Sequence, residues 1–489
     1  MEVLIMHKIS VVRSMLLVFA LTLLAGCGVG LNINPSAALS PDNVNLIFVS
    51  SPDLTYHGPG DVDYDTANLT SKGLHRSLLM ATYLKQQVLG ANNVTAIYTL
   101  APMTHLQTAN RYADVPDMTA IGYIQQFALL NQYTLPLDKF GPAYYTANSY
   151  PLEAAYAKGA VPKGVAVPPA YCPDCSGLDF NNSGGSNDLL LADIIKKNIP
   201  GYYVFSAPWE TISTLLAAAN SQNGYNLNIP ATYMGPNQIY AISIPSSGSA
   251  SLVSYNSNLN PLPTCPPLPS PVPSAACTHV QGLINISRIG GVDGAVVPAT
   301  INKNQTVYIV RHAEAHPDPT FIFENGNFVA AGQWRALDLP VALENKISPD
   351  MVYSIDPSQW FKGTFNFSYV RPSLTVLPYA IAKKLPYYLV SEFLIFDSNV
   401  AKLASDFFFT GGKFSNKTLL LGWESQRINP LIKALLDSYG VSGPVIKWPG
   451  DDYDTVWTVK IDNQGNLTVD NALCEGIDST KLPDTAPQF

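Results

Sequence analysis

Apolar and polar positions follow the same order twice along this chain. In the second half, "TVYIVRHAE" reads as a strand, "FVAAGQWRALDLPVALE" as a glycine and a helix, and "DMVYSIDPSQ" as a strand and loop. In the first half, "NLIFVSSPD", "LTSKGLHRSLLMATYLKQQ" and "VTAIYTLAPMTHLQTA" occur in the same order. A pattern repeated at this scale predicts a duplicated structural unit.

The remainder of each half also repeats. "YYVFSAPWETISTLLAAA" and "TLLLGWESQRINPLIKALL" each read as an apolar strand, a Trp-Glu pair and a helix, and we expect Trp209 and Trp423 to be packing residues. Each half then closes with a predicted strand pair, "QIYAISIPSSGSASLVSY" and "TVWTVKIDNQGNLTVD". Strands that alternate with helices favour a mostly parallel sheet covered on both faces, so each half is expected to be one α/β domain.

Proline density marks the expected domain boundary. A chain of 489 residues is too long for one typical core. The segment "NLNPLPTCPPLPSPVPSAACTH" begins at residue 258, and its prolines exclude regular elements. We therefore predict domains at 44–257 and 303–489, joined by a linker at 258–302. A Pro- and Gly-rich insertion in the first half, before "GGSNDLLLADII", is expected to be a long loop or lid.

The N-terminal segment indicates export. Lys8 and Arg13 precede the apolar run "MLLVFALTLLAGC", which is too short to span a bilayer comfortably and is typical of a signal peptide at 1–26. Its end, "LAGC", resembles the bacterial lipobox, in which the cysteine, here Cys27, is lipid-modified and begins the mature chain. The expected location is then a bacterial cell membrane, reached from the exported side, with 27–43 as a tether. The alternative is a plain signal peptide with a coincidental cysteine.

Charge and the other cysteines exclude some functions. With a formal net charge of -8 and no basic stripe, nucleic acid is not an expected partner. Export permits disulfides, and we favour a local Cys172–Cys175 bridge and a Cys265–Cys277 bridge, with Cys474 left free, although sequence alone does not fix the pairing. The CxxC lacks a second pair or nearby histidines, so no metal is expected.

The Arg311-His312 pair carries the candidate chemistry. It follows a strand directly, where ligands of open parallel sheets bind. Arg371 stands at the start of a later helix in "YVRPSLTVLPYAIAKKL". On these residues, 303–489 resembles the histidine phosphatase superfamily, with its phosphoglycerate mutase-like fold. The resemblance implies two tandem three-layer domains, no cofactor, and a ligand that is phosphate or a phosphorylated small molecule.

The resemblance also implies roles for these side chains. His312 would attack phosphorus as a neutral imidazole, and Arg311 and Arg371 would hold the phosphoryl oxygens through charge-assisted hydrogen bonds. A carboxylic acid should protonate the leaving oxygen, and the candidates are Glu392 and Glu314. The competing interpretation of His312 is an ordinary loop histidine, and His316 is expected at the pocket rim.

The sequence departs from the family at a second catalytic position. Related members read Trp-Glu-His where this chain has "WES", so Ser425 replaces an imidazole. Losing one pre-organised donor typically costs about 10² to 10³ in rate. The chain is therefore expected to be either a slow phosphomonoester hydrolase or an inactive pseudophosphatase that acts as a binding or scaffold module. Its oligomeric state is left open.

The first half departs further from the family. Ser50 and Ser51 stand where Arg and His belong, and Asp53 stands at the position of Glu314. His105 lies near the expected second clamp and is more simply a polar structural residue. This half is expected to be a degenerate copy that serves packing, shields the second site or binds something else.

Overall fold

The structure is a computed structural model, and residues 37–489 form one compact unit in it. It describes residues 37–53, 60–100, 102, 116–131, 133–134, 147–148, 153–155, 165–166, 187–277, 284–286, 295–315, 325–357, 368–390, 400–441 and 448–489. Cys27, His105, Cys172, Cys175, His316 and Glu392 lie outside the described residues.

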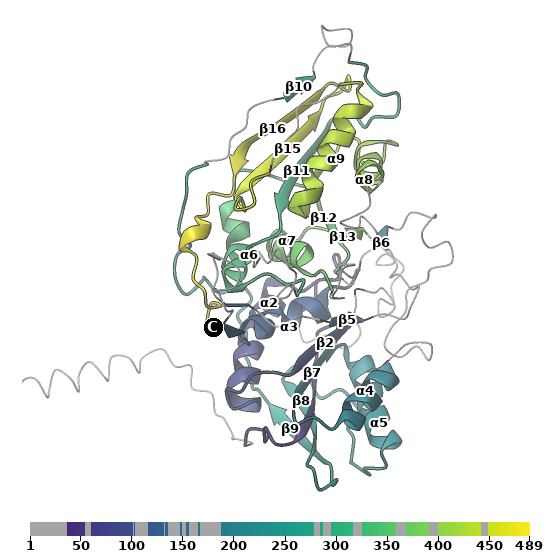
Figure 1. The fold of residues 1–489 in the computed structure, drawn as a ribbon, viewed down its shortest axis with the longest axis vertical. Helices are drawn as coiled ribbons and strands as arrows, with labels where there is room; N and C mark the ends of the chain where they lie inside the picture. The colour runs from purple at the N-terminus through teal and green to yellow at the C-terminus, as the bar shows by residue number, and fades with distance from the viewer. Residues whose placement is uncertain are drawn as a thin grey trace, which may run out of the picture. The chain divides into compact units, whose positions relative to one another are not determined.

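The first half builds a six-stranded sheet (Figure 1). Its strands, in spatial order, are β5 (Glu153–Ala155), β2 (Ala96–Leu100), β7 (Gly201–Ala207), β1 (Val44–Ser50), β8 (Gln238–Ile244) and β9 (Ser251–Asn256). The first four strands run parallel, and β8 and β9 are added antiparallel. The predicted closing strand pair of this half is therefore confirmed.

The second half repeats this order in an eight-stranded sheet. Its strands are β10 (Ile284–Ile286), β16 (Leu467–Cys474), β15 (Thr455–Ile461), β11 (Gln305–Arg311), β14 (Thr418–Trp423), β12 (Met351–Ile355), β13 (Tyr387–Val390) and β6 (Val165–Ala166). From β13 to β16 each strand matches one of the first sheet in position and direction, with β11 equivalent to β1 and β14 to β7. The predicted duplication of a mostly parallel α/β unit is confirmed.

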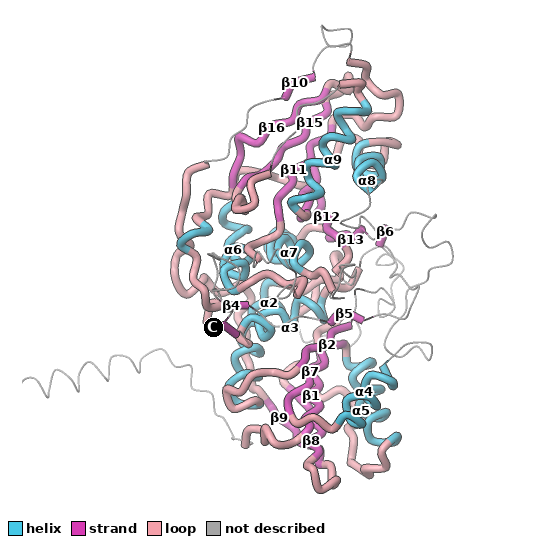
Figure 2. The backbone as a smooth tube through the Cα atoms, in the orientation of Figure 1, coloured by secondary structure: helices cyan, strands magenta, loops and turns pink. Residues whose placement is uncertain are grey.

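The helices, drawn in cyan in Figure 2, also repeat in order along the chain. Those of the first half are α2 (Ser71–Tyr83), which continues into a π-helical turn (Leu84–Val88), α3 (Thr119–Leu129), α4 (Asn187–Lys197) and α5 (Trp209–Gln222). Their counterparts are α6 (Ala330–Ala342), α7 (Arg371–Lys383), α8 (Val400–Phe409) and α9 (Ser425–Ser438). The other short elements are β3 (Tyr133–Thr134), which pairs with β4 (Ala147–Asn148), and a 3₁₀ turn (Ser479–Lys481).

Alternate side chains of the central strands pack against different helical layers. Leu46 and Phe48 of β1 pack in one cluster with α4 and α5, whereas Ile47 and Val49 pack with α2 and α3. Successive strand side chains point to opposite faces, so each sheet is covered on both sides. Each half thus has the expected three layers.

The inner helical layers of the two halves share one core. A single buried cluster contains residues of α2 and α3 together with residues of α6 and α7. Helix α2 contacts α7, and α3 contacts α6. Since α2 corresponds to α6 and α3 to α7, the contacts repeat when the halves are exchanged, as in an isologous interface. The domain limits at 44–257 and 303–489 remain a prediction.

The expected linker contains more structure than its prolines suggested. β10 lies inside 258–302 and pairs antiparallel with β16. A disulfide joins Cys277 to Cys474, with Cα atoms 5.6 Å apart, and Cys265 is free. The predicted Cys265–Cys277 bridge and free Cys474 are therefore wrong. The two cysteines are 197 residues apart in sequence, and pairing of the linker with β16 brings them together. The spacing of cysteines along the chain cannot reveal such a bridge.

The Trp-Glu pairs are not equivalent in the two halves. Trp423 ends β14, opposite Arg311, whereas the residue opposite Ser50 on β7 is Ala207, and Trp209 begins α5. Both tryptophans are buried and pack in apolar clusters, as expected. None of the helices that the structure describes is both long and apolar enough to cross a membrane.

Candidate active site

The candidate residues meet where strands end and helices begin. β11 ends at Arg311, and the backbone N–H of His312 donates to Trp423 O of the neighbouring parallel strand at 2.8 Å. Helix α9 begins at Ser425, and α7 begins at Arg371. This is the edge of an open parallel sheet at which ligands bind.

His312 is held as a neutral imidazole. It is 3% exposed, and its Nδ1–H donates to Ala313 O at 2.8 Å. Because a carbonyl can only accept, the proton resides on Nδ1 and the lone pair on Nε2. Burial, followed by the charges of Arg311 and Arg371, holds the pKa of His312 well below its ordinary value. Nε2 is therefore available as a nucleophile at neutral pH.

The guanidinium group of Arg311 lies over an aromatic ring. Its Nη1 donates to Gly450 O at 2.8 Å and to Asp452 O at 3.0 Å, and its guanidinium carbon is 3.9 Å from the ring centroid of Tyr453. Among the described residues, none accepts a hydrogen bond from its buried Nε. A ligand oxygen could therefore take this donor.

Arg371 is the first residue of α7. Its backbone N–H donates to Gly326 O at 3.0 Å, and its guanidinium carbon is 5.1 Å from the ring centroid of Tyr369. Burial lowers the pKa of Arg371 to about 10, and the Arg311 charge adds to this effect, whereas Tyr453 and Glu424 oppose it. The two guanidinium groups thus repel each other in a buried place, which a bound anion would relieve.

Two tyrosines complete the wall of the site. The rings of Tyr369 and Tyr453 have centroids 6.3 Å and 6.1 Å from that of His312. These are the same rings that contact Arg371 and Arg311. The structure therefore brings together three of the residues that the sequence singled out, His312, Arg311 and Arg371.

Glu424 is a member of the site that the sequence analysis missed. It precedes α9 as its N-cap and is 5% exposed. Burial raises its pKa above the ordinary value, although the Gln426 amide, Arg311, the Ser425 hydroxyl and Arg371 all act in the opposite direction. Its Oε2 has no hydrogen-bond partner within the described ranges. Its sequence signals were its place between an apolar strand and a helix and its position in the "WES" segment.

Ser425 interacts with this carboxyl group. Its hydroxyl donates to Glu424 Oε1 at 3.1 Å. As the first residue of α9, it also belongs to the turn whose backbone N–H groups have no partner within the helix. Ser425 therefore adds a neutral donor, and the helix terminus a partial positive charge.

Glu314 belongs to a different network. Its Oε1 accepts hydrogen bonds from Arg335 Nε at 2.7 Å and from Ser479 at 2.8 Å, and Arg335 also contacts Glu475. The first half contains the same kind of pair, Arg76 Nε to Asp61 at 2.7 Å. This buried ion pair recurs in a half without the histidine, which favours a structural role for Glu314 over the role of proton donor.

The equivalent place in the first half contains carboxyl groups in place of the arginines. Ser51 N donates to Ala207 O at 2.9 Å, as His312 does to Trp423, so Ser50 and Ser51 occupy the Arg-His positions. Burial, with the nearby charge of Asp53, raises the pKa of Asp117 to about 7. Two neighbouring carboxyl groups without the arginines do not suit a phosphate ligand.

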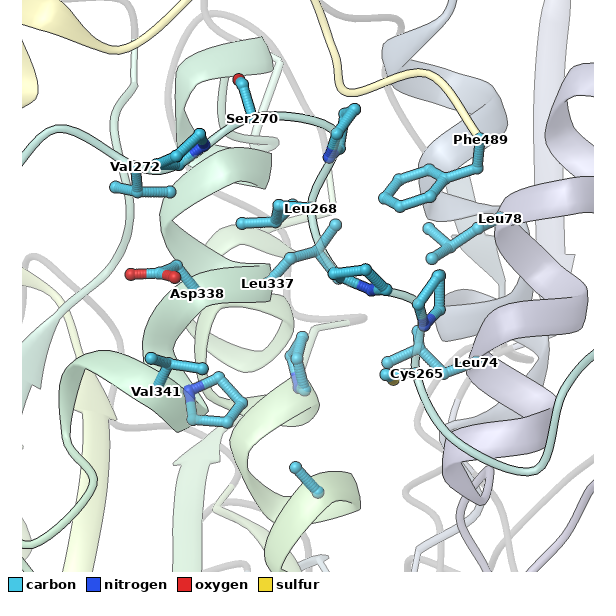
Figure 3. A pocket seen from close by; sticks show the side chains of 17 residues that line it. Leu74, Leu78, Cys265, Leu268, Ser270, Val272, Leu337, Asp338, Val341 and Phe489 are labelled. Carbon is cyan, nitrogen blue, oxygen red and sulfur yellow. The ribbon is translucent and has the colours of Figure 1, made fainter. Parts of the chain in front are cut away.

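An apolar cavity of about 540 Å³ lies apart from these residues (Figure 3). It lies between the Pro-rich segment 265–272 and helices α2, α6 and α7, and Phe489 lines one side. Asp338 is the one charged residue among the described residues that line it. The cavity contains none of the candidate site residues and does not resemble an anion site.

No family model matches this chain, and no curated protein is similar to it. Similar solved structures include a phosphoglycerate mutase from Plasmodium falciparum, with 12% identity over 38% of this chain and 99% of that chain and a TM-score of 0.22. A putative phosphohistidine phosphatase from Agrobacterium tumefaciens has 15% identity over 32% and 92%, with a TM-score of 0.20. A mycobacterial glucosyl-3-phosphoglycerate phosphatase in complex with inorganic phosphate has 12% identity over 36% and 98%, with a TM-score of 0.23.

Proposed function

We propose that the second half binds the phosphoryl group of a phosphomonoester and hydrolyses it through a phosphohistidine at His312. The observation that carries this proposal is a neutral, buried imidazole beside two buried guanidinium groups, Arg311 and Arg371. Such a site offers a nucleophile together with charge-assisted donors for phosphoryl oxygens.

The reaction has two steps. Nε2 of His312 attacks phosphorus, the bond from phosphorus to the ester oxygen breaks, and Glu424 gives its proton to the leaving oxygen. Water then attacks phosphorus, the P–N bond breaks, and the water proton returns to Glu424 as inorganic phosphate forms. The raised pKa of Glu424 supports this role, since the carboxyl group must be protonated in the first step.

The replacement of an imidazole by Ser425 makes the expected turnover slow. A hydroxyl gives one neutral hydrogen bond, and in the structure it is directed to Glu424 at 3.1 Å. The absence of one pre-organised donor typically costs about 10² to 10³ in rate. This observation also favours the second candidate, a phosphate-binding module without turnover.

Trapping of the intermediate separates the two candidates. Incubation with a ³²P-labelled phosphomonoester should label the protein in an acid-labile form, and His312→Ala should abolish the label. Ser425→His should raise turnover by about 10², and His312→Ala in that background should remove the gain. If no variant is labelled or turns over while inorganic phosphate still binds, the binding module is correct. If phosphate binding does not require Arg371, both candidates fail.

We also propose that the protein is exported and anchored by lipid on Cys27. The Cys277–Cys474 disulfide supports export, because such bonds persist in oxidising compartments. Several acyl chains at about 0.8 kcal/mol per buried CH₂ would hold the protein at a membrane. Cys27→Ser should move the protein from the membrane fraction into a soluble exported fraction, whereas Cys265→Ser should not. Unchanged partitioning of Cys27→Ser would contradict the anchor.

A further inference from the structure

Buried amide side chains connect the two halves. Gln125 of α3 donates from Nε2 to Asn327 Oδ1 at 2.8 Å, and Asn327 Nδ2 donates back to Gln125 Oε1 at 3.1 Å. A second pair joins Gln333 Nε2 of α6 to Gln126 Oε1 at 2.9 Å. All four side chains are buried, where loss of one partner leaves the other without a hydrogen bond.

The first pair leads to the backbone of Arg371 in the candidate site. Asn327 follows Gly326, whose carbonyl accepts the backbone N–H of Arg371 at 3.0 Å. The Asn327 side chain also accepts from Phe328 N at 2.9 Å, and Asn327 N donates to Asn325 Oδ1 at 3.0 Å. The turn at 325–328 is thus fixed by the first half on one side and holds the start of α7 on the other.

We infer that helix α3 of the first half positions Arg371, through Gln125 and Asn327, for binding of phosphate in the second half. The inference rests on the proposed function. It gives the half that lacks the Arg-His pair a role: this half is a fixed support of the phosphate site. Gln125 is a positioning residue, because it acts through Asn327 and Gly326 on the backbone of Arg371.

The physical reason is the position of Arg371 in its helix. As the first residue of α7, it has no preceding turn of helix to accept its backbone N–H, and the Gly326 carbonyl takes this role. Misplacement of a site group by about 1 Å can cost about 10² in catalysis. A small shift of the turn at 325–328 would therefore reach the guanidinium group.

The test compares two matched substitutions. Gln125→Leu and Gln333→Leu each remove one buried amide between the halves and keep a side chain of similar size. Both should lower the melting temperature. Only Gln125→Leu should also weaken binding of inorganic phosphate, measured by calorimetry on the full-length chain, by roughly tenfold, a coupling of the size that residues outside a site can have. If Gln125→Leu does not fold, Gln125→Asn, which shortens the amide, takes its place.

Arg371→Ala distinguishes this inference from the proposed function. If the wild-type chain does not bind phosphate, or Arg371→Ala binds it equally well, the proposed function fails. If Arg371→Ala loses binding while the Gln125 and Gln333 variants keep the wild-type dissociation constant, the site is correct and the positioning role is wrong. Weaker binding in both glutamine variants to the same extent would likewise overturn it, since a general loss of packing would explain that result.

Discussion

At the scale of single residues, His312 shows how burial and charge select a protonation state. Its Nδ1–H is occupied by a backbone carbonyl, and two arginines oppose a second proton. The imidazole therefore stays neutral at pH values where an exposed histidine would already be charged. The same environment has a cost in stability at acidic pH.

That cost can be measured. The pKa of His312 is lowered in the folded chain from 6.5, so below this pH the unfolded chain binds more protons. The stability that neutral His312 contributes is complete above the unfolded pKa and is lost as pH falls toward the folded pKa. Between about pH 7.5 and about pH 5.5, wild-type protein should lose more free energy of unfolding than His312→Asn. Urea unfolding at both pH values tests this, and equal losses would contradict it.

Glu424 can be tested as the proton donor through the leaving group. Glu424→Gln keeps the size and the hydrogen bond with Ser425 but cannot give up a proton. Hydrolysis of an alkyl phosphate should fall by about 10² to 10⁴, whereas p-nitrophenyl phosphate, whose leaving group needs no proton, should be affected much less. Steady-state rates for both substrates provide the measurement. A uniform loss for both would assign Glu424 to binding.

The sequence predicted Arg311, His312 and Arg371, because each stands at the end of a strand or the start of a helix. It did not single out Glu424, since a carboxylate becomes chemically distinctive only when it is buried beside cations, which depends on how α7 and α9 converge. Glu314 was selected for its place in the motif, but its distant partners Arg335 and Ser479 decide its environment.

At the scale of elements, each half fixes its first helix to the segment that follows its first strand with a glycine and an arginine. A Cβ at Gly332 would lie 3.0 Å from Glu314 O, and one at Gly73 would lie 2.1 Å from Asp61 O. Three residues later in each helix, Arg335 and Arg76 reach the carboxylates of the same two acidic residues. The repeated pattern of glycine and arginine thus encodes helix packing and not chemistry.

The two arginines should differ in their contribution to stability. Arg335 lies among Glu314, Glu475 and Asp454, and burial raises the pKa of Glu475 to about 8. Arg335→Met leaves these carboxylates uncompensated and should lower the free energy of unfolding by about 3–5 kcal/mol. Arg76→Met leaves only Asp61 and should cost less. Urea unfolding of both variants gives the comparison, and an equal or reversed order would contradict it.

The periodicity predicted the strands and helices well, because burial of one face sets the spacing of apolar residues. It wrongly made Trp209 and Trp423 equivalent: Trp423 is the last residue of its strand, whereas Trp209 follows the end of its strand. It also missed β6, a short strand of the first-half insertion that pairs with β13 of the second sheet. Such long-range pairing depends on how the halves pack, which local patterns do not encode.

At the scale of the whole molecule, the Cys277–Cys474 disulfide ties the segment between the halves to β16. Removal of a native disulfide typically costs about 2–5 kcal/mol. The double variant Cys277→Ser/Cys474→Ser should therefore unfold at lower urea than wild type under non-reducing conditions. Cys265→Ser, at the free cysteine, is the matched control and should keep the wild-type midpoint. Equal midpoints for all three proteins would refute a stabilising role.

Helix α2 contacts α7 and helix α3 contacts α6, so the two halves meet through equivalent faces. Two separate chains associating through such a face would part on dilution, and the site of one would lose the helix supplied by the other. Here both faces belong to one polypeptide, so the second event is intramolecular and its effective concentration is set by the connecting segment. The support that α3 gives to the turn at 325–328 is thus independent of how much protein is present.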